Sequence, residues 1–118
     1  MQQIDQTQIQ DVVTALGNSG SGTVTFNLKS GIRQTFTLTN SAAHTWALSN
    51  KPSGYWEIEI QCTNAGAFTI TMPTISWIKG DGTVSSTFSS MSVTLQASGT
   101  NTFILWGIGS GTVYGKAA

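Results

Sequence analysis

His44 is the only histidine in this 118-residue chain, so it is the one imidazole available to a catalytic or metal site. A single histidine excludes a metal centre built from several imidazoles. The chain has no Gly-x-Ser-x-Gly motif that would present a nucleophilic serine. Because catalytic triads are assembled in space, residue order alone does not exclude one. We nevertheless expect His44 to be a turn or surface residue without a catalytic role.

Glu57 and Glu59 lie two residues apart in a stretch of alternating apolar and polar residues. On a β-strand both would project from one face, about 6.5–7 Å apart, which is close to the spacing of a glycosidase carboxylate pair. Gln61 continues the same polar face, so a solvated strand face is the favoured interpretation. Asp81 would add a third carboxylate, but the spacing lacks the pattern of an EF-hand calcium loop. We expect no enzymatic activity, no metal and no cofactor.

The charge of the chain is low and evenly scattered. Charged residues make up 8% of the sequence, against about 25% in a typical domain, and the formal net charge is zero. The glycine-rich residues 20–22 and 107–111 lack the Lys-Ser/Thr and the following helix of a phosphate-binding loop. No basic stripe is present, so we expect no nucleic-acid binding. The basic residues are Lys29, Arg33, Lys51, Lys79 and Lys116.

Four tryptophans are a high number for so short a chain. Tryptophan is enriched at protein interfaces and combines an apolar body with a polar N–H. Trp56 and Trp77 share apolar faces with isoleucines, so we expect both in the core. Trp46 and Trp106 are candidates for contact with a partner or a glycan, and a second layer of core is an equally weighted alternative. The residues predicted for a shallow glycan site are Trp46, His44 and Glu59.

Residues 1–21 differ in pattern from the rest of the chain. Their apolar residues follow the i, i+3, i+4, i+7 spacing of an amphipathic helix, which Asp5 would cap and Gly17 would end. The glycine- and serine-rich residues 17–22 predict a flexible linker. This short helix would be either a lid on the chain's own sandwich or an arm that binds a partner. The predicted contact residues are Ile4, Ile9, Val12, Val13 and Leu16.

From residue 22 to residue 118, apolar residues recur at every second position, which predicts β-strands. Eight such runs are separated by turns rich in glycine, asparagine, serine and proline. We expect an all-β domain, an eight-stranded antiparallel β-sandwich or jelly roll. The single Cys62 alternates with isoleucines and is expected to be a buried thiol. The expected strands cover residues 24–28, 35–39, 46–48, 56–62, 68–72, 75–77, 91–97 and 103–106.

The last of these runs is apolar on both faces. Phe103 and Leu105 would point to one side of the strand, and Ile104 and Trp106 to the other. A strand that is apolar on both faces must be covered on both sides. The cover would be the N-terminal helix or the same strand of another subunit. We therefore predict Ile104 and Trp106 as partner contacts, and a homo-oligomer.

The last third of the chain carries a recognisable order of turns and aromatic residues. A proline-led strand ends in tryptophan before a glycine turn in residues 73–82 (PTISWIKGDG), a two-faced strand follows in residues 99–106 (GTNTFILW), and residues 111–115 (GTVYG) close the pattern. This order resembles the β-sandwich modules of tailed-phage virion proteins. The resemblance covers roughly residues 22–115. It implies a structural or binding role in a virion, and a trimer.

On this basis we expect a non-enzymatic capsid decoration (cement) protein that binds the major capsid protein or another virion protein and stabilises the shell. The alternative is a tail-fibre or head-fibre module that recognises a host-surface glycan. A lectin-like domain outside any virion is a third, disfavoured interpretation. The first residues lack a signal-peptide pattern, and no run approaches the roughly 20 apolar residues of a membrane span. The predicted location is the virion, after synthesis in the host bacterial cytoplasm, with no membrane partner.

Overall fold

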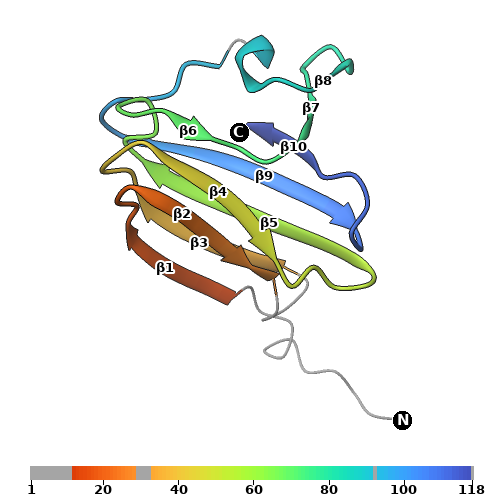
Figure 1. The fold of residues 1–118 in the computed structure, drawn as a ribbon. Coiled ribbons are helices and arrows are strands. Elements are labelled where there is room, and N and C mark those ends of the chain that lie inside the picture. The colour runs from red at the N-terminus through yellow and green to blue at the C-terminus, as the bar shows by residue number, and fades with distance from the viewer. Residues whose placement is uncertain (1–11, 29–32, 92, 118) are drawn as a thin grey trace.

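The structure is a computed structural model that describes residues 12–28, 33–91 and 93–117 (Figure 1). These residues form ten β-strands and a short 3₁₀ helix, and they contain no α-helix. The elements are β1 (Val12–Asn18), β2 (Gly22–Asn27), β3 (Arg33–Thr39), β4 (His44–Ser49), β5 (Tyr55–Thr63), β6 (Ile70–Thr71), β7 (Ser76–Ile78), β8 (Val84–Ser85), the 3₁₀ helix η3 (Phe88–Met91), β9 (Thr100–Ile108) and β10 (Tyr114–Ala117).

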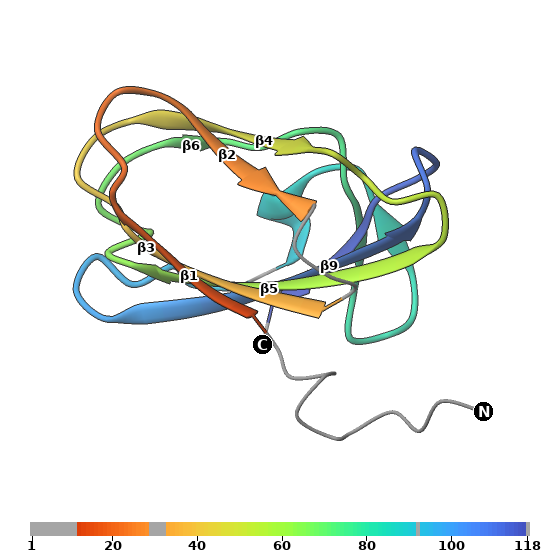
Figure 2. The same cartoon turned by 90° about the horizontal axis from the view of Figure 1, so that it is seen from below.

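The strands form two sheets that face each other (Figure 2). The large sheet has seven strands in the order β1-β3-β5-β9-β10-β7-β8, and the small sheet has three in the order β2-β4-β6. The chain crosses from one sheet to the other after each of its first six strands. Among these six strands, neighbours within a sheet are therefore two strands apart in sequence and run in the same direction.

Hydrogen bonds between successive corners hold these crossings in register. The Ser19 N–H donates to the Thr39 carbonyl at 2.7 Å, and the Asn40 N–H donates to the Thr63 carbonyl at 2.8 Å. The Ser19 hydroxyl also donates to Asn40 Oδ1 at 3.2 Å. These bonds satisfy backbone groups that the turns would otherwise leave without partners. The first six strands therefore form three successive turns of a coil, and each turn contributes one strand to each sheet.

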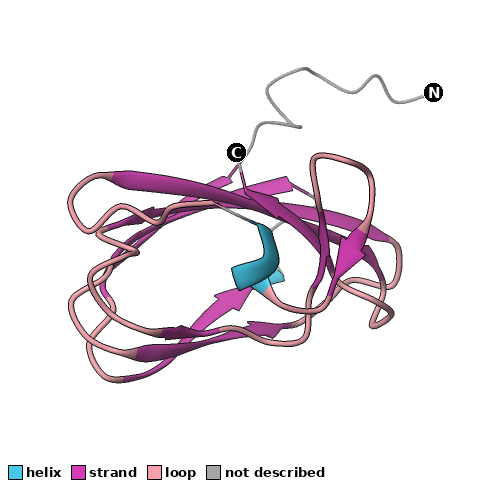
Figure 3. Cartoon of the chain, turned by 90° about the horizontal axis from the view of Figure 1, so that it is seen from above, coloured by secondary structure: helices cyan, strands magenta, loops and turns pink. Residues whose placement is uncertain are grey.

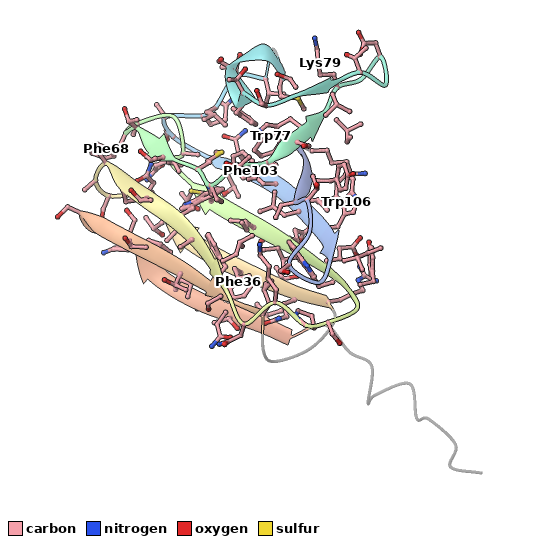
Figure 4. The ribbon with its side chains drawn as sticks, turned by 45° about the vertical axis from the view of Figure 1, so that its right-hand side comes forward. Phe36, Phe68, Trp77, Lys79, Phe103 and Trp106 are labelled. Atoms are coloured by element: carbon pink, nitrogen blue, oxygen red, sulfur yellow. The ribbon has the colours of Figure 1, made fainter. Side chains whose placement is uncertain are left out.

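The core lies between the two sheets and is rich in aromatic rings. Phe26 of β2 meets Phe36 of β3 edge to face, with ring centroids 5.2 Å apart. Trp46 of β4 meets Phe103 of β9 at 5.3 Å, also edge to face. Such aromatic pairs add about 0.5–1.5 kcal/mol each beyond the area they bury. Phe36 and Phe103 lie inside the fold (Figure 4).

The helix predicted for the N-terminal segment is wrong where the structure describes that segment. Val12–Asn18 is β1, which pairs in parallel with β3 at the edge of the large sheet. Residues 19–21 form a hydrogen-bonded turn into β2 instead of a loose linker. The spacing of apolar residues in this short segment fits a helix, but the backbone of β3 offers a ladder that a helix cannot use. The part of the predicted helix before residue 12 lies outside the described residues.

The strand predicted over residues 91–97 is also wrong. This region contains the end of η3 followed by irregular chain, as far as residues 93–97 are described. Phe88 of η3 packs on Trp77 at 4.8 Å and on Phe103 at 5.6 Å between ring centroids. The helix thereby fills the end of the core where the small sheet stops (Figure 3).

The prediction of a mostly β fold is confirmed, but an eight-stranded antiparallel jelly roll is not. Five of the eight strand pairings are parallel and three are antiparallel. Residue alternation predicts which side chains point inward, and this holds for either strand direction. The direction depends on the crossings between sheets, which alternation does not encode.

Candidate functional site

Strand β9 divides its apolar side chains between the core and the outer surface of the large sheet. Phe103 and Leu105 are fully buried, whereas Ile104 and Trp106 are half-buried on the opposite face. Ile108, at the end of the strand, is 69% exposed. This confirms that β9 is apolar on both faces. The core covers only one of them.

Pairing with the neighbouring strands gathers more large side chains around Trp106. The register places Tyr55 of β5 beside Ile108, and Tyr114 of β10 beside Trp106. The rings of Trp106 and Tyr114 stack, with centroids 6.0 Å apart and planes 21° apart. We call this cluster the outer patch. Its members are Tyr55, Ile104, Trp106, Ile108 and Tyr114.

Glycines on the inner face allow the strands of the outer patch to lie close to the core. Gly107 follows Trp106 and points inward, where a Cβ would come within 3.0 Å of the indole of Trp56. Gly115 follows Tyr114, and a Cβ there would lie 2.9 Å from the indole of Trp77. Each outer ring is therefore next in sequence to an inner glycine that makes room for a core tryptophan.

Charged groups on β3 and β5 flank one side of the outer patch. Arg33 forms an ion pair with Glu57, with Nε and Oε2 3.0 Å apart, and the Tyr55 hydroxyl donates to Glu57 Oε1 at 3.4 Å. Partial desolvation raises the pKa of Tyr55 above its ordinary value, and the Glu57 carboxylate raises it further. Glu57 lies beside Trp106 in the strand register. The Glu57 carboxylate therefore already interacts with Arg33 and with the Tyr55 hydroxyl on this face.

The neighbouring carboxylate, Glu59, has a different environment. Its Oε2 accepts a hydrogen bond from Gln61 Nε2 at 3.0 Å, as expected for a continuous polar strand face. The hollow beside Glu57 and Glu59 holds about 160 Å³, whereas pockets for drug-sized ligands typically hold about 300–1,000 Å³. This hollow gives the two carboxylates no cleft in which to enclose a sugar ring.

His44 and Trp46 both lie in the core. His44 is therefore not the turn or surface residue predicted, and Trp46 follows the core alternative instead of the partner or glycan contact. Both side chains are almost completely buried. The Trp46 indole N–H donates to His44 Nε2 at 2.9 Å, and His44 Nδ1 lies 2.9 Å from the Ala42 carbonyl. Because an indole can only donate, Nε2 accepts and Nδ1 carries the proton. Trp46 offers no open ring face for stacking on a glycan, and Glu59 lies on the outer face of the other sheet.

The N-terminal residues predicted as contacts are only partly within the described chain. Val13 is 66% exposed on β1, and Leu16 packs against the core of its own chain. Val12 belongs to β1. Ile4 and Ile9 lie outside the described residues.

Other features of the described chain offer little chemistry. A groove of about 790 Å³ lies between residues 65–73 and residues 86–88 and 95, and every residue that lines it is uncharged. Within the described ranges, no group of three His, Cys, Asp or Glu side chains is placed to hold a metal ion. No helix there is long and apolar enough to cross a membrane.

The sequence predicts Ile104 and Trp106 of the outer patch as partner contacts but does not single out Tyr55 and Tyr114. Tyr55 and Tyr114 each precede an inward-facing residue in an alternating run, and this was the only available signal. Their contact with the outer patch depends on the register between β5, β9 and β10, which the sequence of a single strand does not contain. Comparison with known protein families, with characterised proteins and with solved structures finds no match to this chain.

Proposed function

We propose that this protein is a non-enzymatic structural component of a phage virion that acts by binding other proteins through the outer face of its large sheet. The observation that carries the proposal is the two-faced strand β9, whose core face is covered and whose outer face presents Trp106 and Ile108. Contiguous exposed apolar surface rimmed by polar groups marks interaction sites. Trp and Tyr are also the residues that contribute most at interfaces.

Binding energy at this face would come from removing the outer patch from water. Each large apolar side chain that becomes buried contributes about 1.5–3 kcal/mol before the costs of association. The resemblance to tailed-phage β-sandwich modules supports a virion setting. As a capsid decoration protein, the chain would bind the major capsid protein or another virion protein at the junctions of the shell. It would thereby raise the free energy needed to separate neighbouring shell subunits.

A fibre module that binds a host-surface glycan is the second candidate function. Trp106 and Tyr114 favour it, because partly exposed aromatic rings beside a carboxylate such as Glu57 suit the stacking of a sugar. In this alternative the glycan site moves to the outer patch, since Trp46 is buried. The two candidates share one surface and differ in what covers it.

Counting the chain in purified virions tests the proposed function. Quantitative mass spectrometry would give its copy number relative to the major shell protein. Hundreds of copies near a simple ratio would support capsid decoration, and a handful would support the fibre alternative. Complete absence from the particle would contradict both.

A further inference from the structure

We infer that two copies of this chain pair face to face through the outer surfaces of their large sheets, related by a two-fold axis that runs along β9. This inference rests on the proposed function, because it names a second copy of this chain as the virion protein that covers the outer patch. Contact of the pair with the shell would then use another surface. It is carried by the distribution of charge across that surface, by its size and by the contrast with the small sheet.

Opposite charges lie on either side of the centre of the face. The strand register places Glu59 of β5, Ile104 of β9 and Lys116 of β10 in one row across the sheet. With neighbouring strands about 4.8 Å apart, Glu59 and Lys116 are separated by about 10 Å at the backbone. Within the described residues, neither forms an ion pair in its own chain. Each is therefore open to pair with a partner.

This row is complementary to itself in one orientation only. A two-fold axis along β9, above Ile104, would place Glu59 of one copy over the Lys116 of its partner, and the reverse. A two-fold axis across the strands would instead place like charges opposite each other. Because like charges placed opposite each other at an interface repel, this second arrangement is excluded. A two-fold contact is self-complementary by construction, so the same pair forms twice.

The area of the face is comparable with that of a small protein–protein interface. The face spans four neighbouring strands: β3 with seven residues, β5 and β9 with nine each, and β10 with four. With these strand lengths, the rise per residue and the strand spacing give a flat footprint of about 450 Å². Side-chain relief makes the accessible area larger, and a standard interface uses about 800 Å² on each partner. Two sheets packed in this way keep their strands within about 30° of each other.

The small sheet offers no comparable face. The exposed side chains of β2 are polar, as Thr23, Thr25 and Asn27 illustrate, and the exposed residue of β4 is Thr45. Three of the large apolar residues most open to solvent, Tyr55, Ile108 and Tyr114, instead surround Trp106. The zero net charge of the chain also removes the general repulsion between two copies. A second copy is thus the occupant that fits both the apolar centre and the charged rim.

Charge reversal combined with sedimentation equilibrium tests the pairing. The wild-type protein should show twice the 12.5 kDa chain mass. Glu59→Lys and Lys116→Glu should each raise the dissociation constant by about tenfold or more, because each disturbs two symmetry-related pairs. The double variant should restore wild-type affinity. Lys51→Glu makes the same charge change on a loop outside this face and should have no effect.

A second pair of variants tests the apolar centre. Ile108→Ser should weaken the dimer without unfolding the chain, since Ile108 is exposed. Phe68→Ser, at an exposed position on the loop before β6, is the matched control and should leave the affinity of the dimer unchanged. A monomer at all concentrations, a trimer, or a dimer insensitive to both charge reversals would overturn the inference. A dimer that is absent from virions would contradict only the proposed function, and an abundant virion protein that is monomeric would contradict only the pairing.

Discussion

The indole of Trp106 stacks on the phenol ring of Tyr114 on the outer side of the large sheet, with ring centroids 6.0 Å apart. The two residues lie opposite each other in the antiparallel pairing of β9 and β10. On the inner side, the next residues are Gly107 and Gly115. At this point of the sheet the two strands therefore place glycines against the core and large rings toward solvent. This inversion of the usual arrangement makes the face a candidate for binding.

Substitution of Gly115 tests the close packing beneath this face. A Cβ at this position would lie 2.8 Å from Leu105 Cδ2 and 2.9 Å from Ile75 Cγ2. Gly115→Ala should therefore lower the free energy of unfolding by about 1–3 kcal/mol through overpacking. Gly80→Ala is the control, because nothing lies within 4 Å of a Cβ there. Equal stability of the two variants in urea denaturation would show that the strands are not packed as described.

Removal of the imidazole acceptor tests the buried pair of His44 and Trp46. His44→Leu should cost about 1–3 kcal/mol, because the buried indole N–H of Trp46 would lose its only acceptor. Combining it with Trp46→Phe removes the donor as well, so the double variant should be more stable than the sum of the two single losses predicts. Strict additivity would argue against the hydrogen bond. The proton on Nδ1 is checked independently by the ¹⁵N shifts of the ring.

Titration of Cys62 gives a pH dependence with a defined sign. Burial raises the pKa of this thiol from 9.0 to about 11. The unfolded thiol ionises first, so this contribution to stability is complete below pH 9 and is lost as the pH rises from 9 to 11. Measured as the difference between wild type and Cys62→Ala, the loss should be confined to this range. Iodoacetamide should also react slowly with the folded protein and rapidly in denaturant. Fast alkylation of the native state would show that the thiol is exposed.

Truncation tests whether β1 belongs to the fold. Deletion of residues 1–17 removes most of β1, the parallel partner of β3, together with the packing of Leu16 on the core. The melting temperature should fall by more than about 5 °C, since a loss of only 1 kcal/mol gives a shift of this size in a small domain. Deletion of residues 1–11 retains β1 and is the control. An unchanged melting temperature for the longer deletion would restore the idea of a detachable arm.

The sequence predicted the residues of the fold better than their arrangement. The alternation of Trp56, Ile58, Ile60 and Cys62 correctly placed one face of β5 in the core, because side-chain direction follows from the strand period alone. Parallel strands were missed, since the direction of a strand depends on which sheet the chain enters at each turn. Ile104 and Trp106 were found from the same alternation.

The errors have equally specific causes. The prediction of a helix over β1 is wrong because the apolar residues of so short a segment fit both the period of a helix and that of a strand. Pairing with β3 stabilises the strand. The sequence left Trp46 open between a partner or glycan contact and a second layer of core, and the structure buries it against Phe103. Tyr55 and Tyr114 were missed because their proximity to Trp106 depends on strand register, which involves segments distant in sequence.

The measurement that tests the central claim most directly is hydroxyl-radical footprinting of the aromatic side chains, before and after assembly. Dilute protein is compared with concentrated protein and with virions, and the buried rings of Trp46 and Trp56 serve as internal references. If the outer face of the large sheet is the binding surface, oxidation of Trp106 and Tyr114 falls on assembly while the references do not change. Equal oxidation of Trp106 and Tyr114 in every state would contradict the account.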